Sequence, residues 1–324
     1  MRIAPSLSRW LLGPDSDPSV RSRALVEVLG ATPTDPRVRS AKRSIGRTGW
    51  AAAILREQLS DGQWATPGSS AGELYRPKYI ATNWRMLVLA DLGLTRSDPR
   101  VRKMTRLVLR RWGGPRGSLG GRYSEVCVTG NALRAFLRFG YAGEPEVDRM
   151  LRWLLRAQKS DGGWHCFPSR HGTLDAWEGL AALAYLPATK RSPSVERAIE
   201  RGAEFYLERR LCREGPTRYE PWYRIHYPNH YYYDILVGLD MLTRLGYGAD
   251  PRLSPAIRWL TGRRDAGGRW PLDASHPDLP PTERYSPRPP YYPFVLEPPG
   301  RPSRWATVSA LAVLARIESA RSRR

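Results

Sequence analysis

The sequence QKSDGGW at residues 158–164 decides the fold, because related segments recur along the chain. They are QLSDGQW at 58–64, RRDAGGRW at 263–270 and a degenerate copy, GGPRGSLGGRY, at 113–123. Each copy follows a segment with helical periodicity, and its Asp and Gly residues are typical of a turn. A motif that recurs at helix junctions predicts a chain built from repeated helical units.

A second recurring phrase marks where helices end and begin. Examples are MLVLADLGLTRSDPRV from Met86 and GLDMLTRLGYGADPRL from Gly238. The Asp or Ser before proline can cap the orphan amides of a helix, and proline fits the first helical turn. The glycine upstream supplies the left-handed stop of the preceding helix. Each unit is therefore predicted to be a helical hairpin.

The two helices of each hairpin differ in composition. The first is apolar on nearly every face, whereas the second is apolar on one stripe and rich in arginine elsewhere, as expected for an inner and an outer ring. Six hairpins can bury their apolar faces by closing into a barrel. We predict an all-α fold, one (α/α)6 toroid domain over residues 1–324, and an open solenoid is the alternative.

The boundaries follow from these signals. Inner helices are expected at 17–30, 78–94, 124–140, 173–187, 230–246 and 303–318. Outer helices are expected at 36–58, 98–112, 145–158, 193–211 and 251–263, with residues 5–12 of the N-terminal segment 1–16 as the twelfth helix. The proline-rich loop 271–302 cannot be helical and is expected to pack over one end of the ring, and residues 319–324 form a basic tail.

Composition limits the partners and the compartment. The chain has 52 Lys and Arg against 31 Asp and Glu, a formal charge of +21, which would attract anionic lipid, nucleic acid or a phosphorylated substrate. The basic residues are scattered along helices and no nucleic-acid motif accompanies them, so nucleic acid is not an expected partner. Three irregularly spaced cysteines, no secretion signal and no long apolar run favour a cytoplasmic protein.

The repeated segments resemble the Gln-Trp repeat of squalene and oxidosqualene cyclases. The whole chain also resembles bacterial prenyltransferase and squalene oxidase repeat proteins, through EVCVTGNALRAFLRFGY, DGGWHC, YYYDILVGLD and GRPSRWATVSAL. The resemblance implies the toroid of terpenoid cyclases and protein prenyltransferases. It also implies a hydrophobic or isoprenoid small molecule as partner, and the basic charge adds peripheral contact with an anionic membrane.

In such a ring, residues that open the inner helices share one cavity although they are distant in sequence. The candidate substrate-binding residues are Tyr79, Trp84, Trp177, Glu178, His230, Tyr231, Tyr232, Arg304 and Trp305. Aromatic faces among them could stabilise a carbocation by cation–π attraction. Helix N-termini there would favour a diphosphate or carboxylate. His226 and His276, in the long loops, either contact substrate or stabilise turns.

Asp175 and Asp234 are the candidate catalytic acids. The segment TLDAWEGLAAL, from Thr173, resembles the acidic motif that opens an inner helix in class II cyclases, but Gly172 and Leu174 replace two of its three acids. A buried lone carboxyl can have a raised pKa and donate a proton. The alternative for Asp175 is a helix cap, and for Asp234 a hydrogen-bond or metal-ligand role.

A metal site is the second interpretation. The resemblance to protein prenyltransferases and lanthionine cyclases implies zinc at inner-helix ends, and Cys127, Cys166 and His171 are the candidate ligands. Their spacing is not diagnostic, since Cys127 could be a small buried side chain and His171 a cap.

Three functions from different classes remain open. The first is a terpenoid-cyclase-like enzyme that acts on a prenyl or other isoprenoid substrate in an aromatic central cavity. The second is a zinc-dependent transferase or cyclase, and the third is a binding module for a lipid or peptide, because fold alone does not fix function.

Overall fold

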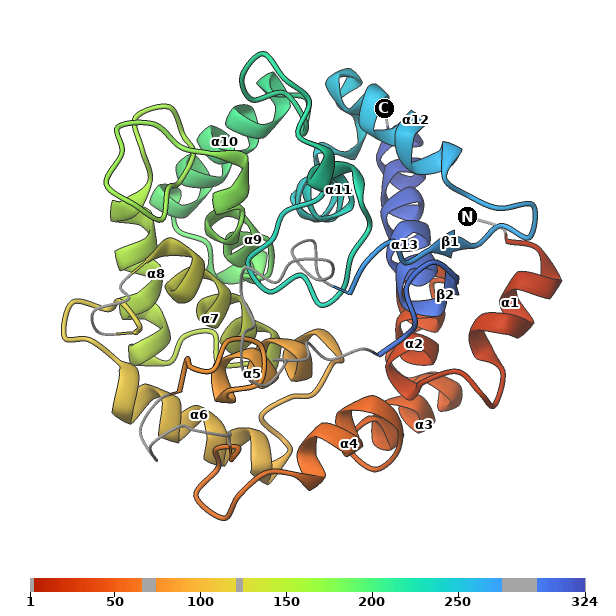
Figure 1. The fold of residues 1–324 in the computed structure, drawn as a ribbon, viewed down its shortest axis with the longest axis horizontal. Helices are drawn as coiled ribbons and strands as arrows, with labels where there is room; N and C mark the ends of the chain where they lie inside the picture. The colour runs from red at the N-terminus through yellow and green to blue at the C-terminus, as the bar shows by residue number, and fades with distance from the viewer. Residues whose placement is uncertain (1–2, 66–73, 121–124, 276–295, 324) are drawn as a thin grey trace.

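The computed structural model describes residues 3–65, 74–120, 125–275 and 296–323. Its helices form two concentric rings (Figure 1). The inner ring consists of α2 (Pro18–Arg23) with the π-helical η1 (Ala24–Val28), α5 (Thr82–Asp91), α7 (Val126–Phe139), α9 (Glu178–Ala184), α11 (Ile235–Arg244) and α13 (Arg304–Arg321). The outer ring consists of α1 (Pro5–Leu12), α3 (Pro36–Ile45), α4 (Gly49–Arg56), α6 (Pro99–Trp112), α8 (Pro145–Ala157), α10 (Pro193–Glu208) and α12 (Ser254–Gly262).

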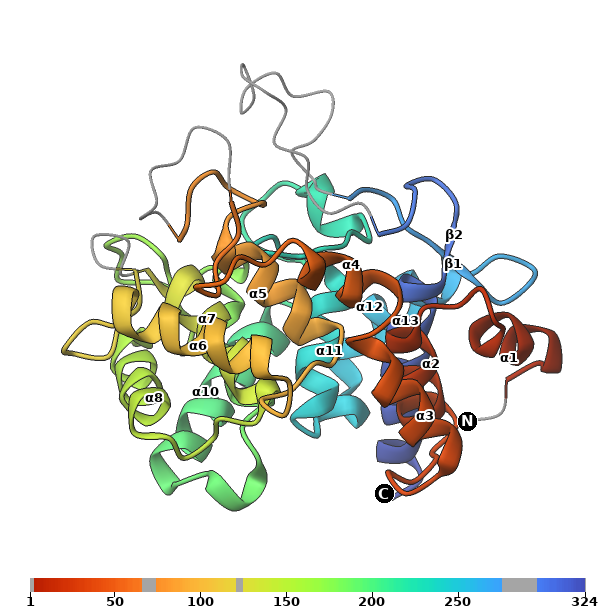
Figure 2. The same ribbon diagram turned by 90° about the horizontal axis from the view of Figure 1, so that it is seen from below.

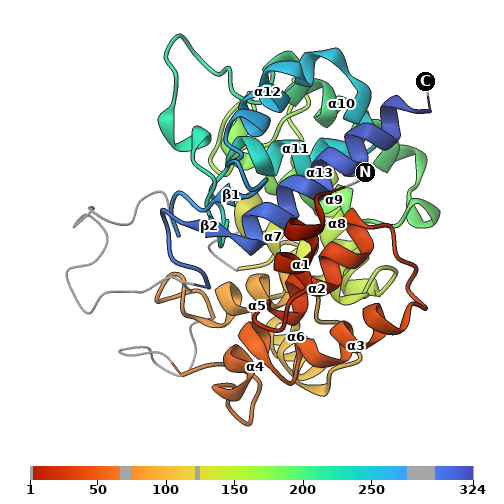
Figure 3. The same ribbon diagram turned by 90° about the vertical axis from the view of Figure 1, so that its right-hand side faces the viewer.

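Short elements complete the rings. The 3-10 turns are η3 (Leu174–Ala176), η4 (Ala188–Lys190), η5 (Glu220–Tyr223), η6 (Tyr247–Ala249) and η7 (Pro251–Leu253), and strand β1 (Trp270–Pro271) pairs antiparallel with β2 (Pro302–Ser303). Seen from the side, β1, β2 and the loops that precede the inner helices lie at one end of the ring, and the C-terminus lies at the other (Figures 2 and 3). We call the first of these the loop end.

The ring closes between the last inner helix and the first. Helix α13 packs against α2 and η1, Arg23 donates from Nη1 to Ser309 Oγ at 2.9 Å, and Arg316 donates from Nη1 to Glu27 Oε2 at 3.3 Å. The toroid is therefore confirmed, and the open solenoid is excluded. Residues 276–295 of the proline-rich segment lie outside the described residues. In the described part of the chain, no helix is both long and apolar enough to cross a membrane.

The repeated motif has one geometry in its three full copies. In each, the tryptophan indole N–H donates to the carbonyl ten residues upstream, in the outer helix that the motif follows, and the ring is buried. The pairs are Trp64 with Ile54 at 2.8 Å, Trp164 with Leu154 at 2.9 Å and Trp270 with Leu260 at 2.7 Å. The indole thus satisfies a carbonyl near the helix end and fills the space beneath it.

The glutamine of the motif joins neighbouring hairpins. Gln158 donates from Nε2 to Gly162 O at 2.8 Å and to Ala198 O of the next outer helix at 2.9 Å. Gln58 makes the same pair of bonds two hairpins earlier. The Asp-Pro signals also act as predicted, since Asp35 and Asp98 accept from the backbone two residues on, each at 2.8 Å.

Three helix predictions were wrong for identifiable reasons. The single outer helix expected at 36–58 is broken into α3 and α4 at Gly49, whose φ of +71° lies in the left-handed region. The carboxylate of Asp17 occupies the space where a Cβ would lie, 2.2 Å from it. Left-handed φ values at Tyr79 (72°) and His230 (48°) likewise end any continuous helix, so α5 and α11 begin later than expected.

Candidate functional site

A cavity of about 80 Å³ lies at the centre of the ring. Its polar and aromatic walls come from all six inner helices and from the segment 225–229. They are Arg23, Asp91, Arg134, Arg138, Trp177, Tyr185, His226, Tyr227, Asn229, Asp234, Asp240, Trp305 and Ser309. The volume has room for roughly five to eight waters, whereas sites that enclose a whole drug-sized ligand measure roughly 300–1,000 Å³. The predicted aromatic cavity is thus small, and charged groups share its walls.

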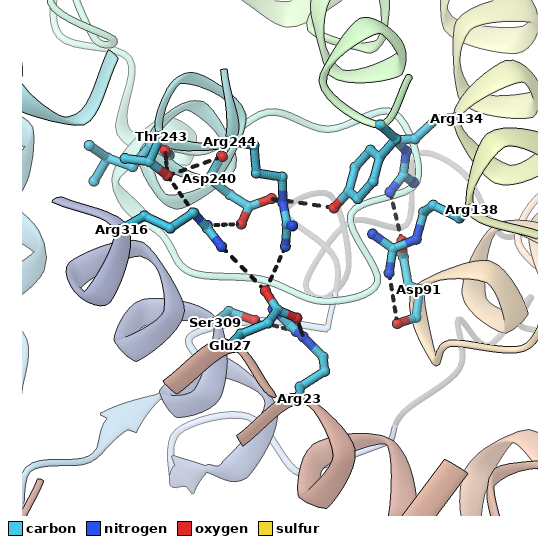
Figure 4. A network of polar contacts seen from close by, with 12 residues as sticks. Arg23, Glu27, Asp91, Arg134, Arg138, Asp240, Thr243, Arg244, Ser309 and Arg316 are labelled. Carbon is cyan, nitrogen blue, oxygen red and sulfur yellow. Dashed lines mark hydrogen bonds and ion pairs between the residues drawn. The ribbon is translucent and has the colours of Figure 1, made fainter. Parts of the chain in front are cut away.

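Much of the charge belongs to one set of ion pairs, which we call the charged network (Figure 4). Its members are Arg23, Glu27, Asp91, Arg134, Arg138, Asp240, Arg244 and Arg316. Figure 4 shows these side chains converging from different inner helices. The network therefore ties elements that are far apart in the sequence.

Glu27 is the anion that accepts from the most arginines in this network. It accepts from Arg23 Nε at 2.8 Å, Arg244 Nη2 at 2.7 Å and Arg316 Nη1 at 3.3 Å. Burial raises the pKa of this carboxyl, but the charge of Arg23 and then that of Arg244 outweigh it and hold the pKa well below its usual value. Asp240 has a pKa lowered in the same way, with Arg244 and Arg316 overcoming the effect of burial. Both groups are therefore carboxylates at neutral pH.

A second arm of the network joins α5 to α7. Arg134 donates from Nη1 to Asp91 Oδ1 at 2.6 Å, and Arg138 donates from Nη2 to the Asp91 carbonyl at 3.1 Å. Side-chain exposures of 7% and 11% make Arg134 and Asp91 a buried pair. Removing either partner would leave an uncompensated charge in the core.

Guanidinium groups cover the aromatic walls. Arg23 lies 4.7 Å from the ring centre of Trp305, and Arg134 lies 5.3 Å from that of Trp177. Tyr185 faces Arg138 at 4.4 Å. The rings of Trp177 and Trp305, which were predicted to face a substrate cation, thus each have an arginine of the protein on one face.

Asp234 and His226 form a buried pair on the cavity wall. Asp234 caps α11 by accepting from Val237 N at 2.8 Å, and its other oxygen lies 2.9 Å from His226 Nδ1. The two side chains are 1% and 0% exposed. The carboxylate fixes the imidazole with Nδ1 as donor, which leaves Nε2 as the acid–base atom. Asp234 was a predicted catalytic residue. The sequence left open whether His226 contacts substrate or stabilises a turn, because its partner Asp234 lies eight residues further along the chain.

Asp175 lies at the loop end, outside the cavity lining. It is exposed in η3 and accepts from Trp222 Nε1 at 2.7 Å. The protein around the carboxyl raises its pKa by desolvation, and the bond from Trp222 partly opposes that rise. This carboxyl group is therefore easier to protonate than a free aspartate.

Five of the predicted substrate-binding residues form a separate packed cluster between the start of α5 and the loop before α11. They are Tyr79, Trp84, His230, Tyr231 and Tyr232. The hydroxyls of Tyr79 and Tyr231 are 2.8 Å apart, and the Trp84 ring lies 5.2 Å from that of His230. The cluster contacts its own members and does not line the central cavity. Of the predicted substrate-binding residues, Trp177 and Trp305 do.

Glu178 is buried between α7 and α9 and accepts from Asn131 Nδ2 at 3.4 Å. Burial, reinforced by the nearby Cys166, raises its pKa well above the usual value. Arg304 turns away from the ring centre, since its Nε donates to Trp10 O at 3.1 Å and its guanidinium covers the Trp10 ring.

Only two of the three predicted zinc ligands lie together. Cys127 and Cys166 lie within hydrogen-bond reach of each other, and this bond raises the pKa of the Cys127 thiol, as does burial. His171 is 78% exposed and instead faces Asp161, with Nδ1 and Oδ2 3.8 Å apart. Across the described ranges, no three His, Cys, Asp or Glu side chains are grouped so that they could hold a metal ion. The described residues thus do not fit a Cys/His zinc site.

No family model matches the chain, and no curated protein matches it. The similarity is to solved structures. Type II terpene cyclase MstE from Scytonema is 17% identical, covers 94% of this chain and 88% of its own, and has a TM-score of 0.45. A complex of an MstE variant with the substrate geranylgeranyl dihydroxybenzoate is 16% identical, with 94% and 87% covered and a TM-score of 0.44. A protein from Actinoplanes is 19% identical, with 96% and 92% covered and a TM-score of 0.45.

Proposed function

We propose that the protein is an enzyme of the terpenoid-cyclase type, which transforms an isoprenoid whose reacting end enters the central cavity. The observation that carries the proposal is the buried pair of His226 and Asp234 beside Trp177 and Trp305 on one cavity wall. An oriented imidazole in a water-poor pocket is suited to general acid–base catalysis. The aromatic walls suit the apolar part of the substrate.

The proton transfer is assigned to one atom. Asp234 accepts a hydrogen bond from Nδ1 of His226, so the proton stays on Nδ1 and Nε2 of the neutral ring is free to act as a base. Nε2 would remove a proton from the carbocation, whose carbon skeleton is left with a new double bond. Asp234 acts as a positioning residue, because its carboxylate already accepts from Val237 N and from the imidazole. The proton that starts the reaction is assigned to Asp175 at the loop end, whose pKa is raised.

The cavity volume restricts how the substrate binds. About 80 Å³ accommodates a few heavy-atom groups and not a whole prenyl chain. The remainder of the chain is therefore assigned to the loop end, where the half-buried rings of Tyr231 and Tyr232 offer aromatic surface.

The test is turnover by the purified full-length protein. It is incubated with prenyl diphosphates and with prenylated aromatic acids, and products are sought by mass spectrometry. The proposal expects a new product that His226→Gln abolishes and that Asp234→Asn reduces strongly. His165→Gln, at a half-buried histidine outside the cavity lining, is the matched control and should retain activity. A folded protein that transforms none of these substrates would refute the enzyme and favour a binding module.

A further inference from the structure

Three buried polar side-chain atoms, in residues that line the central cavity, have no hydrogen-bond partner among the described residues. They are Trp177 Nε1, Tyr227 Oη and His226 Nε2. Their side chains belong to residues that are 3%, 4% and 3% exposed. A buried polar group without a partner costs about 1–3 kcal/mol, and native proteins have few of them. Three around one cavity indicate that the cavity is built to hold a polar ligand.

The chemistry of these atoms specifies the ligand. The indole nitrogen can only donate, and the phenol can donate or accept, whereas Nε2 of the neutral imidazole accepts because Nδ1 donates to Asp234. Arg23 and Arg134 add guanidinium groups to the same wall. Converging donors of this kind are complementary to an oxygen-rich acceptor.

The charge balance points the same way. In the charged network, five arginines face three carboxylates, Glu27, Asp91 and Asp240. Asp234 adds a fourth negative charge on the wall, so that one positive charge remains in excess among the described groups when His226 is neutral. An excess charge in a low-dielectric interior favours binding of an ion of the opposite sign.

From this geometry we infer that the central cavity binds an oxyanion, a phosphate-type or carboxylate group, which accepts from Tyr227 and Trp177 and offsets the excess of arginine, while Nε2 of His226 remains available as the base. The cavity of about 80 Å³ suits such a group. The inference rests on the proposed function where it names the substrate class. If the protein is such an enzyme, its substrate is an isoprenoid with an oxyanion at the end that enters the ring. The anion would also offset the arginine charge that opposes a developing carbocation.

The experiment is titration calorimetry of the full chain with sodium diphosphate, sodium phosphate and sodium acetate, each at constant ionic strength set with sodium chloride. The inference predicts saturable one-to-one binding of at least one oxyanion. Preference for diphosphate or phosphate identifies a phosphorylated head group, and preference for acetate identifies a carboxylic acid. Because the protein carries a charge of +21, binding at several weak sites with no saturable site would overturn the inference.

Two variants assign the binding to this cavity. Tyr227→Phe and Trp177→Phe each remove one donor, and each should weaken the anion affinity at least tenfold. Tyr206→Phe is the matched control, because its buried hydroxyl donates to Leu174 O at 3.1 Å outside the cavity, and it should bind like the unaltered protein. Wild-type affinity in both donor variants, with folding verified by circular dichroism, would overturn the inference.

The outcomes separate the two proposals. Anion binding that depends on Tyr227, in a protein that transforms no isoprenoid, keeps the oxyanion site and refutes the enzyme. Turnover of an uncharged isoprenoid without any saturable anion binding refutes the oxyanion site and keeps the enzyme.

Discussion

Replacement of Glu27 by Gln tests whether buried charge closes the ring. Glu27 lies in the first hairpin, and two of its partners, Arg244 and Arg316, lie in the last two inner helices. The amide has nearly the same shape, but it removes the charge that three guanidinium groups share. Arg244 and Arg316 would keep only Asp240 as an anionic partner.

The expected magnitude follows from burial. Breaking a buried ion pair by changing one partner costs about 3–5 kcal/mol, and the Glu27 side chain is 21% exposed. We therefore expect the lower end, about 3 kcal/mol of unfolding free energy. With an unfolding entropy proportional to chain length, this corresponds to a fall in Tm of about 4 °C.

The assay is thermal unfolding followed by circular dichroism, with urea unfolding for the free energy. The matched control is Glu204→Gln, which removes an exposed partner of Arg252, at 2.6 Å and with half of its side chain in solvent. Such a surface pair contributes about 0–1 kcal/mol. Equal destabilisation by the two variants would refute the reasoning that the charged network holds the two ends of the ring together.

Three further predictions concern the core and the cavity. The lowered pKa values of Glu27 and Asp240 mean that the stabilisation from these two carboxylates is complete above about pH 5 and is lost as the pH falls below about 4; acid unfolding of the unaltered protein should therefore be steeper than that of Glu27→Gln, and equal slopes would contradict this. Without ligand, Tyr227→Phe should raise the unfolding free energy by about 1–3 kcal/mol, because it removes a buried hydroxyl that has no partner among the described residues, whereas Tyr206→Phe should cost about 1 kcal/mol because it breaks a formed hydrogen bond; urea unfolding measures both, and a loss in the first would indicate a partner for that hydroxyl. Gly179→Ala would place a Cβ 2.3 Å from the Trp164 ring and should cost about 1–3 kcal/mol of unfolding free energy. The control Gly262→Ala meets nothing within 4 Å and should be neutral or stabilising by up to about 1 kcal/mol. Similar Tm values for the two variants would show that the inner ring tolerates expansion at this contact.

The repeat architecture was readable from local signals. Asp35 and Asp98 cap the helices that their Asp-Pro signals predicted, and the three tryptophans of the repeated motif have equivalent hydrogen bonds. These features depend on residues within about ten positions of one another, so periodicity and cap chemistry suffice to find them.

Tertiary contacts determined what the sequence could not show. The break at Gly49 depends on Asp17, which lies 32 residues away in the sequence. Its carboxylate accepts a hydrogen bond from Trp50 N at 2.8 Å. The left-handed backbone at Tyr79 and His230 carries no strong composition signal, because neither residue is glycine or asparagine. Both features shortened helices that a pattern of apolar residues had extended.

The candidate site was predicted only in part. Trp177, Trp305 and Asp234 line the cavity as expected, because they open inner helices. The arginines of its wall were not among the predicted site residues, because the sequence shows basic residues only as scattered along the helices. Arg23 and Arg134 are inward-facing only because the ring places their helices around one centre.

The most direct test of the central claim is an experimental electron-density map of the protein crystallised with a prenyl diphosphate and, separately, with a prenylated aromatic acid. The account predicts an oxyanion within hydrogen-bond distance of Tyr227 Oη and Trp177 Nε1, with the prenyl chain leading towards the loop end. A cavity that contains only ordered water while the ligand binds elsewhere, or not at all, would contradict it.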